Sequence, residues 1–261
     1  MDNIFEVEVN PFSDEYLLQE IEFYDLKEVY ERDGVKVIQQ TVEFARCDDY
    51  LNKNIRISTP AFPLLIIDGI LWMSLTYMEL QSQFIPIEFA HGRVACGGLG
   101  LGYYVLRIMG NASVDSIDVY EKESRIIAFF KETFGDREGF EKLMFIEGDV
   151  RKQLRGKEYD FVYMDIYATL LPDEVVSDTH LFFDANEIEH YHFWGLEKIL
   201  LDALNLGLLD TSEVSYAYRD YFRLWLKAND NYKMYACQTT SDFVESAVEA
   251  LRKTGLLDEA W

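Results

Sequence analysis

Four short segments of the chain combine residue types that could bind a nucleoside. One is a glycine-dense turn spanning residues 97–102, and the other three end in Glu121, Asp149 and Asp165. Glycine has no Cβ, so such a turn can bend tightly and bring backbone N–H groups close to a ligand. One carboxylate could accept both hydroxyls of a ribose, and another could accept an adenine amino group. These residue types predict a nucleotide-type site.

The spacing of the glycines separates two classes of cofactor. Counted from Gly98, the dinucleotide fingerprint GxGxxG needs a third glycine at position 103, where the chain has Tyr103. The observed GxGxG suits S-adenosylmethionine, a nucleoside joined to an amino acid, because no pyrophosphate needs room. The predicted cofactor-binding residues are Gly97, Gly98, Gly100 and Gly102 for the amino-acid portion, Glu121 for the ribose, and Asp149 with the Val150 N–H for the adenine.

Each acid taken alone could equally be a solvated residue or a helix N-cap. Together they follow the strand-like runs RVACG, SIDVYE, LMFIEGD and YDFVYMD, which alternate with the helix-like runs YYVLRIMG, ESRIIAFFKETF and VRKQLRG. Alternating β and α elements predict a doubly wound, mostly parallel α/β sheet with helices on both faces. Ligands in such sheets lie outside the carboxyl ends of the strands. Four consecutive strand ends facing one crevice therefore favour a site.

The flanking regions have a different pattern. Residues 1–86 are expected to be β-rich, with a short helix over Ser13–Tyr24, hairpin turns at Asp33-Gly34 and Asp68-Gly69, and a helix over Thr76–Ala90 that Pro86 kinks or ends. After Asp165, helical spacing predicts a helix over Asn186–Asn205 and another over Ser241–Thr254 with Ser241 as N-cap. NYKMYACQ is expected to be a late strand, and residues 211–227 fit strand or helix. We predict a small N-terminal β-rich domain over residues 1–74 and an α/β domain over residues 75–261.

Composition limits the partners. The net charge of −23 over 261 residues argues against a nucleic-acid substrate and favours a neutral or cationic small molecule, although it also fits a purely solubilising role. No apolar run is long enough to span a bilayer, and no membrane partner is expected. The three cysteines are widely spaced, so a reducing cytoplasm is the expected location.

No metal site is expected from the four histidines. They form no HExxH motif, and His190 and His192 would point to different sides of the predicted helix. A set of aromatic residues fits either a core or the wall of a substrate pocket, where tyrosine and tryptophan can hold a cation. This set consists of Tyr163, Tyr167, His192, Trp194, Tyr216, Tyr218, Tyr221, Phe222 and Trp225.

The order of the segments LLIIDG, YMELQSQFIP, CGGLGLG, VYEKE, EGDV and YDFVYMD resembles the spermidine synthase branch of the class I S-adenosylmethionine-dependent methyltransferase folds. The resemblance covers about Tyr24 to Ala168. The Asp68-Gly69 hairpin, followed by Tyr77 and Glu79 on the helix that leads to the glycine strand, is its more specific part. It implies a small N-terminal β domain, a doubly wound catalytic domain and usually a homodimer.

The chain departs from that branch at four positions. The aspartate in the glycine turn, which helps to hold the aminopropyl amine of decarboxylated S-adenosylmethionine, is Leu99 here, and the second aspartate after the fourth strand is Ala168. Trp72 and Gln83 replace a glutamine and a histidine. An amine acceptor needs paired carboxylates to hold it as a cation and a base to free its lone pair. Half of the carboxylates that this branch uses are missing here, because Leu99 and Ala168 stand in place of aspartates.

Three functions follow from these observations. The first is an enzyme that transfers a methyl group from S-adenosylmethionine to a small molecule, with Asp165, helped by Tyr77 or Glu79, orienting or deprotonating the acceptor. The second is aminopropyl transfer from decarboxylated S-adenosylmethionine to a polyamine, which would require Asp173 or Glu174 to replace the acid lost at Leu99. The third is a nucleoside-binding or interaction protein in which catalysis has eroded.

Overall fold

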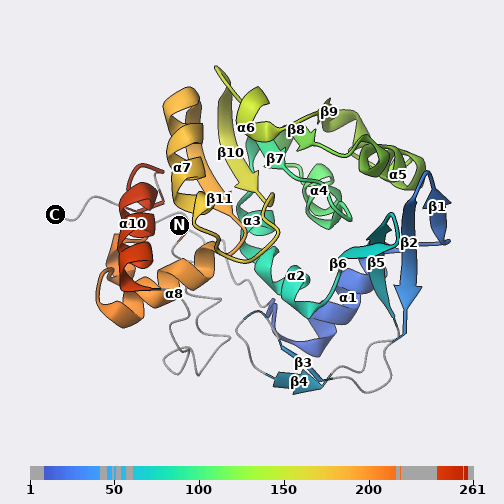
Figure 1. The fold of residues 1–261 in the computed structure, drawn as a ribbon, viewed down its shortest axis with the longest axis horizontal. Coiled ribbons are helices and arrows are strands. Elements are labelled where there is room, and N and C mark those ends of the chain that lie inside the picture. Colours follow the sequence, from blue (N-terminus) through green and yellow to red (C-terminus); the bar gives the residue numbers. More distant parts are fainter. Residues whose placement is uncertain are drawn as a thin grey trace, which may run out of the picture.

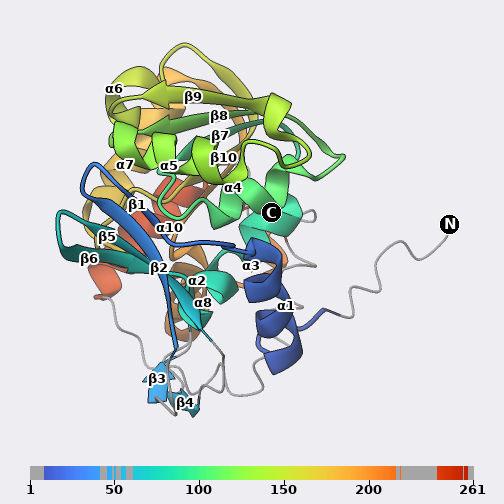
Figure 2. The same cartoon turned by 90° about the vertical axis from the view of Figure 1, so that its right-hand side faces the viewer.

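The structure is a computed structural model that describes residues 9–41, 46–48, 50, 54–56, 61–215, 218, 240–254 and 256–257. It contains a five-stranded sheet, a four-stranded sheet and a two-stranded pair. In Figure 1, helices α7, α8 and α10 lie on one side of the molecule, and the four-stranded sheet lies on the other. Figure 2 shows that sheet below the five-stranded one.

The five-stranded sheet is parallel throughout and confirms the predicted α/β class. Its order is β11-β10-β7-β8-β9, so the strand order reverses between β7 and β10, the position where ligands bind in doubly wound folds. The strands are β7 (Gly92–Gly97), β8 (Val114–Glu121), β9 (Leu143–Glu147), β10 (Glu158–Met164) and β11 (Glu187–Phe193). The connecting helices are α4 (Tyr103–Met109), α5 (Ser124–Phe134), α6 (Val150–Gln153) and α7 (Glu174–Ala185), with a 3₁₀ turn, η1, at Phe140–Lys142.

The four-stranded sheet is antiparallel, in the order β1-β2-β5-β6. Its strands are β1 (Tyr30–Arg32), β2 (Val35–Gln40), β5 (Phe62–Ile67) and β6 (Ile70–Ser74), and a separate pair is formed by β3 (Arg46–Asp48) and β4 (Asn54–Arg56). Both Asp-Gly turns form hairpins as predicted, with φ of 49° and 81° at Asp33 and Gly34 and of 50° and 81° at Asp68 and Gly69. The predicted first helix also forms: α1 (Asp14–Tyr24) begins after the N-cap Ser13.

The two sheets are joined through α5. The Tyr30 ring packs against Phe129 with centroids 5.0 Å apart. Arg125 donates from Nη1 to Oδ1 of Asp68 at 2.9 Å, next to the β5–β6 turn. These contacts hold the antiparallel sheet close to the carboxyl ends of β7 and β8. The division at residue 74 stays a prediction.

The predicted helix over Asn186–Asn205 is wrong in its first half. Residues Glu187–Phe193 form β11, paired with β10, and α8 (Leu196–Leu206) begins only after Gly195, which has φ of 103°. Burial explains the error, because residues Tyr191, His192 and Phe193 are all covered. A strand covered on both faces loses its alternating pattern and can match helical spacing.

The predicted helix over Thr76–Ala90 is two helices, α2 (Tyr77–Ser82) and α3 (Phe84–Phe89), which meet at Gln83. Pro86 does not cause the break; it lies in the first turn of α3, where a missing N–H costs little. The last helix, α10 (Ser241–Leu251), is capped by Thr240 rather than Ser241. A 3₁₀ turn, η2, spans Thr211–Glu213, whereas NYKMYACQ and most of residues 211–227 lie outside the described residues. Within the described part of the chain, no helix has the length and apolar character that crossing a bilayer requires.

Candidate cofactor and acceptor site

The glycine turn connects β7 to α4. Gly98, Gly100 and Gly102 have φ of 88°, 52° and 79°, a region that favours glycine. Packing adds a second requirement: a Cβ on Gly98 would lie 2.1 Å from the Asp165 carbonyl oxygen, and one on Gly102 would lie 2.3 Å from the Phe130 ring. The close approach of β7 to the segment after β10 thus accounts for Gly98 without any ligand.

Glu121 ties this turn to the end of β8. Its Oε2 accepts a hydrogen bond from the Leu99 N–H at 2.9 Å, and its Oε1 accepts one from the Glu123 N–H at 2.8 Å. A carboxylate has about four lone-pair sites, so each oxygen keeps acceptor capacity for a hydroxyl. The Gly100 N–H has no hydrogen-bond partner among the described residues. The two Glu121 oxygens are thus available as acceptors, and the Gly100 N–H as a donor, for a ligand.

Two residues from the N-terminal elements pack on the turn. Tyr24, at the end of α1, donates its hydroxyl to the Leu101 carbonyl at 2.8 Å, and the Leu101 N–H contacts Met73 Sδ of β6 at 3.3 Å. Met73 Sδ would also lie 2.5 Å from a Cβ on Gly100. The sequence offered no signal for these contacts, because Tyr24 and Met73 are ordinary core residues in an isolated chain.

Asp149 and Val150 lie at the start of α6, after β9. Asp149 is the N-cap, accepting from the Arg151 N–H at 3.1 Å, and pairs with Lys122 Nζ at 3.4 Å. Partial burial acts to raise the pKa of Asp149, but the Arg151 N–H bond and the Lys122 charge outweigh it and lower that pKa. Val150 is buried and begins the helix, so its N–H has no carbonyl four residues earlier within α6. Asp149 therefore stays ionised and stabilises the start of α6.

Asp165 lies directly after β10, and its N–H donates to the Gly97 carbonyl at 2.8 Å. Burial, and then the charge of Glu121, raise the pKa of the Asp165 carboxyl. Burial, and then the charge of Asp165, raise that of Glu79 on α2, while a hydrogen bond from Gln83 Nε2 at 3.4 Å opposes this. The structure thus brings Glu79 and Asp165 into one acidic pair. Gln83, which the sequence suggested only as a lost histidine, is the side chain that bonds to Glu79.

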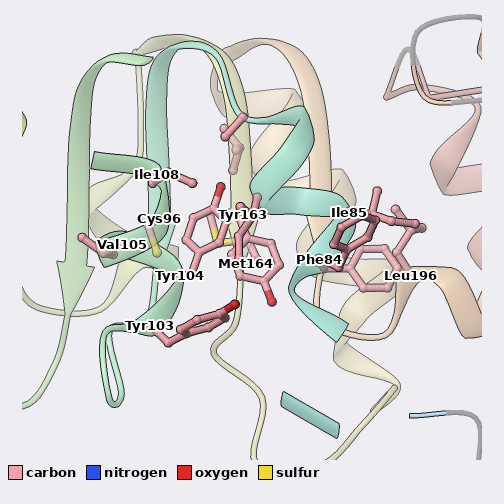
Figure 3. Packing of buried hydrophobic residues seen from close by; sticks show 14 of the residues in the cluster. Phe84, Ile85, Cys96, Tyr103, Tyr104, Val105, Ile108, Tyr163, Met164 and Leu196 are labelled. Atoms are coloured by element: carbon pink, nitrogen blue, oxygen red, sulfur yellow. The ribbon is translucent and has the colours of Figure 1, made fainter. Parts of the chain in front are cut away.

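The charges of this pair also act on Tyr163, which belongs to a buried group of aromatic and polar side chains. The Tyr163 and Tyr104 rings are 4.4 Å apart, and both hydroxyls are buried with no hydrogen-bond partner among the described residues (Figure 3). The acidic charges that act on Tyr163 to raise its pKa, after burial, are those of Asp165, Glu79 and Glu197. His192 Nε2 lies 2.9 Å from Glu197 Oε1, at a position where both side chains are buried.

The aromatic residues singled out in the sequence include buried members and members that the structure does not describe. Tyr163, His192 and Tyr218 are buried together, and Trp194 Nε1 donates to Ser82 Oγ at 3.0 Å. The members Tyr216, Tyr221, Phe222 and Trp225 lie outside the described residues.

The remaining residues that the sequence predicts for the site do not all lie beside Glu121 or Asp165. Tyr77 is buried, with its ring edge-on to Phe62 at 5.6 Å. Leu99 is buried beside Glu121, whereas Trp72 is 64% exposed. Asp173 and Glu174 are exposed at the start of α7, and the Leu99 N–H bonds to Glu121. Two hollows on the described surface, one beside Arg107 and Arg137 and one beside Arg93 and Lys253, contain none of the predicted site residues.

Comparison with known proteins gives limited similarity. The chain matches no known family profile and no curated protein sequence. Among solved structures it is similar to a spermidine synthase bound to the transition-state analogue AdoDATO, at 12% identity and a TM-score of 0.37 over 62% of this chain and 52% of that one. It is also similar to the Thermotoga maritima spermidine synthase, at 14% identity and 0.38 over 64% and 55%.

The match thus spans about half the length of these spermidine synthases. A further similar structure is the SAH-bound methyltransferase PaMTH1 of Podospora anserina, at 17% identity and a TM-score of 0.34 over 62% of this chain and 69% of that one.

Proposed function

We propose that the protein is an S-adenosylmethionine-binding group transferase, and that its reaction is methyl transfer to a small molecule with an amine. The observation that carries the proposal is the connection between the glycine turn and Glu121 at adjacent carboxyl ends of β7 and β8. The remaining acceptor capacity of Glu121 suits the two ribose hydroxyls, and the Gly100 N–H suits the carboxylate of an amino-acid moiety. Gly97, Gly98 and Gly102 would allow the close backbone approach, and Asp149 and the Val150 N–H at the start of α6 would bind the adenine.

When bound, the cofactor supplies an activated methyl group on a sulfonium. The chain therefore has to bind, orient and manage one proton. Asp165 and Glu79 serve the acceptor: the pair attracts an ammonium ion, and its raised pKa values suit proton transfer near neutral pH. Tyr163, on which the charges of Asp165 and Glu79 act, has a hydroxyl with no hydrogen-bond partner among the described residues and would offer the amine a further acceptor.

Aminopropyl transfer is the second candidate, and the same pair favours it. Glu79 supplies from α2 the second carboxylate that Ala168 lacks. Leu99 counts against it, because an apolar side chain buried beside Glu121 offers the aminopropyl ammonium no counter-charge. This contrast makes the preferred cofactor form the discriminating measurement.

Titration calorimetry with S-adenosylmethionine, its decarboxylated form and S-adenosylhomocysteine tests the proposal. We expect S-adenosylmethionine and S-adenosylhomocysteine to bind and the decarboxylated form to bind more weakly. Preference for the decarboxylated form would support aminopropyl transfer instead. Absence of heat with all three would leave a protein that binds none of these nucleosides and would refute both enzyme functions.

Variants then locate the site. Glu121→Ala should weaken S-adenosylmethionine binding at least about tenfold, as expected for loss of charge-assisted hydrogen bonds. Glu147→Gln is the matched control, because Glu147 pairs with Glu121 on the neighbouring strand and is exposed. Asp165→Asn should preserve cofactor affinity and abolish transfer to an amine acceptor. Unchanged affinity in Glu121→Ala would place the pocket elsewhere.

A further inference from the structure

Two histidines that are far apart in the sequence meet on one face of the parallel sheet. His190 lies within β11, and His91 directly precedes β7. Strand β10 separates these two strands, with Phe161 paired to both Val94 and His190. The two imidazole rings are nevertheless only 5.4 Å apart between centroids.

Glu189 completes a group with the chemistry of a metal site. One ring nitrogen of each histidine and one carboxylate oxygen of Glu189 all lie within 4.8 Å of one another. Glu189 Oε1 is 3.9 Å from His190 Nδ1. That nitrogen is buried and has no hydrogen-bond partner among the described residues. A buried polar atom without a partner is costly, so an additional partner is expected there.

The tautomer of His91 also suits metal binding. Its Nδ1 lies 2.8 Å from the Phe89 carbonyl oxygen, so Nδ1 carries the proton and Nε2 keeps the lone pair. Metal-binding histidines commonly donate their second ring nitrogen to a backbone carbonyl in this way, which fixes the orientation of the ring.

Ring packing is the simpler explanation for the cluster. Phe89 contacts both imidazoles edge-on, at 5.7 Å from His91 and 4.9 Å from His190. Such packing accounts for the position of the rings. Asp160 also acts on the His190 imidazole through its backbone and its charge, but no described residue forms a hydrogen bond with His190 Nδ1.

We propose that His91, Glu189 and His190 bind a divalent transition-metal ion, with Zn²⁺ as the best fit. Two imidazoles and one carboxylate are a common three-ligand set for Zn²⁺, with a water in the fourth position. Tetrahedral bonds of about 2 Å place ligand atoms roughly 3.3 Å apart, so only a small inward movement of the side chains is needed. The site is separate from Glu121 and Asp165, and the ion would link β11 to the start of β7 across β10.

The role of this ion would be structural, and the test is independent of cofactor binding. Zn²⁺ is titrated into the full chain after EDTA treatment and dialysis, by calorimetry and by thermal unfolding. We expect one equivalent to bind, and Tm to rise by roughly 5 °C at a hundredfold excess over Kd. Mg²⁺ should give no rise, because it prefers oxygen ligands.

His91→Gln and His190→Gln should each weaken Zn²⁺ binding by at least about tenfold. His180→Gln is the matched control, since His180 lies on α7 and contacts Lys253 Nζ at 3.1 Å. Co²⁺ absorption bands of the unaltered protein provide a readout that does not depend on the variants folding. Absence of stoichiometric Zn²⁺ binding, featureless Co²⁺ spectra, or an equal loss in His180→Gln would overturn the proposal.

Discussion

Glu121 should stabilise the fold even when no ligand is bound. The side chain is only 9% exposed, and its two oxygens accept the Leu99 and Glu123 N–H groups. In Glu121→Ala both donors lose their acceptor. A buried donor without a partner costs about 1–3 kcal/mol. The Leu99 bond is buried and the Glu123 bond is only partly buried, which suggests about 2 and 1 kcal/mol respectively.

One effect acts in the opposite direction. The charge of Glu121 raises the pKa of Asp165, so removing it relieves some repulsion. We therefore expect a net loss of about 2 kcal/mol in the free energy of unfolding. For a chain of this size that loss lowers Tm by about 4–8 °C.

Urea unfolding followed by circular dichroism measures this directly. The midpoint should fall while the slope m is unchanged, because the native surface is similar. Glu121→Gln, which keeps one acceptor oxygen, should lose about half as much. Glu147→Gln, on the paired strand, should change stability by less than about 0.5 kcal/mol. Equal stability of Glu121→Ala and Glu147→Gln would refute the assigned hydrogen bonds.

Two further predictions concern the acidic pair and the turn. Burial first, and then neighbouring charges, raise the pKa of Asp165 to about 7 and that of Glu79 to about 8. The native state therefore holds more protons than the unfolded chain above pH about 4, and stability should fall as pH rises from about 5 to 8.5. Glu79→Gln should reduce this fall, so its urea midpoint relative to the unaltered protein should increase with pH; a constant difference would contradict the raised pKa of Glu79. Gly98→Ala should cost about 2 kcal/mol more than Gly156→Ala, since both positions have positive φ but only Gly98 faces the Asp165 carbonyl oxygen at 2.1 Å. Equal urea midpoints of the two glycine variants would show that the close approach is absent.

Much of the fold before residue 165 could be predicted because its signals are local. The Gly98-Leu99-Gly100 spacing, the apolar strands and the Asp-Gly hairpins each depend on a few adjacent residues. These predictions are confirmed by the parallel order of β10, β7, β8 and β9 and by the two β-hairpins. The apolar residues of segment 186–193 fit either the helical or the strand period, and only pairing with β10 makes the segment a strand.

The sequence alone determined which residues lie at the strand ends: the glycine turn, Glu121, Asp149 and Asp165. The tertiary structure decided what they contact. It placed Glu79 with Asp165, Met73 against the turn, and His91 beside His190. The physical reason is that charge, burial and metal-binding geometry depend on distances in space. Sheet order and helix packing set those distances between segments that carry no signal of one another along the chain.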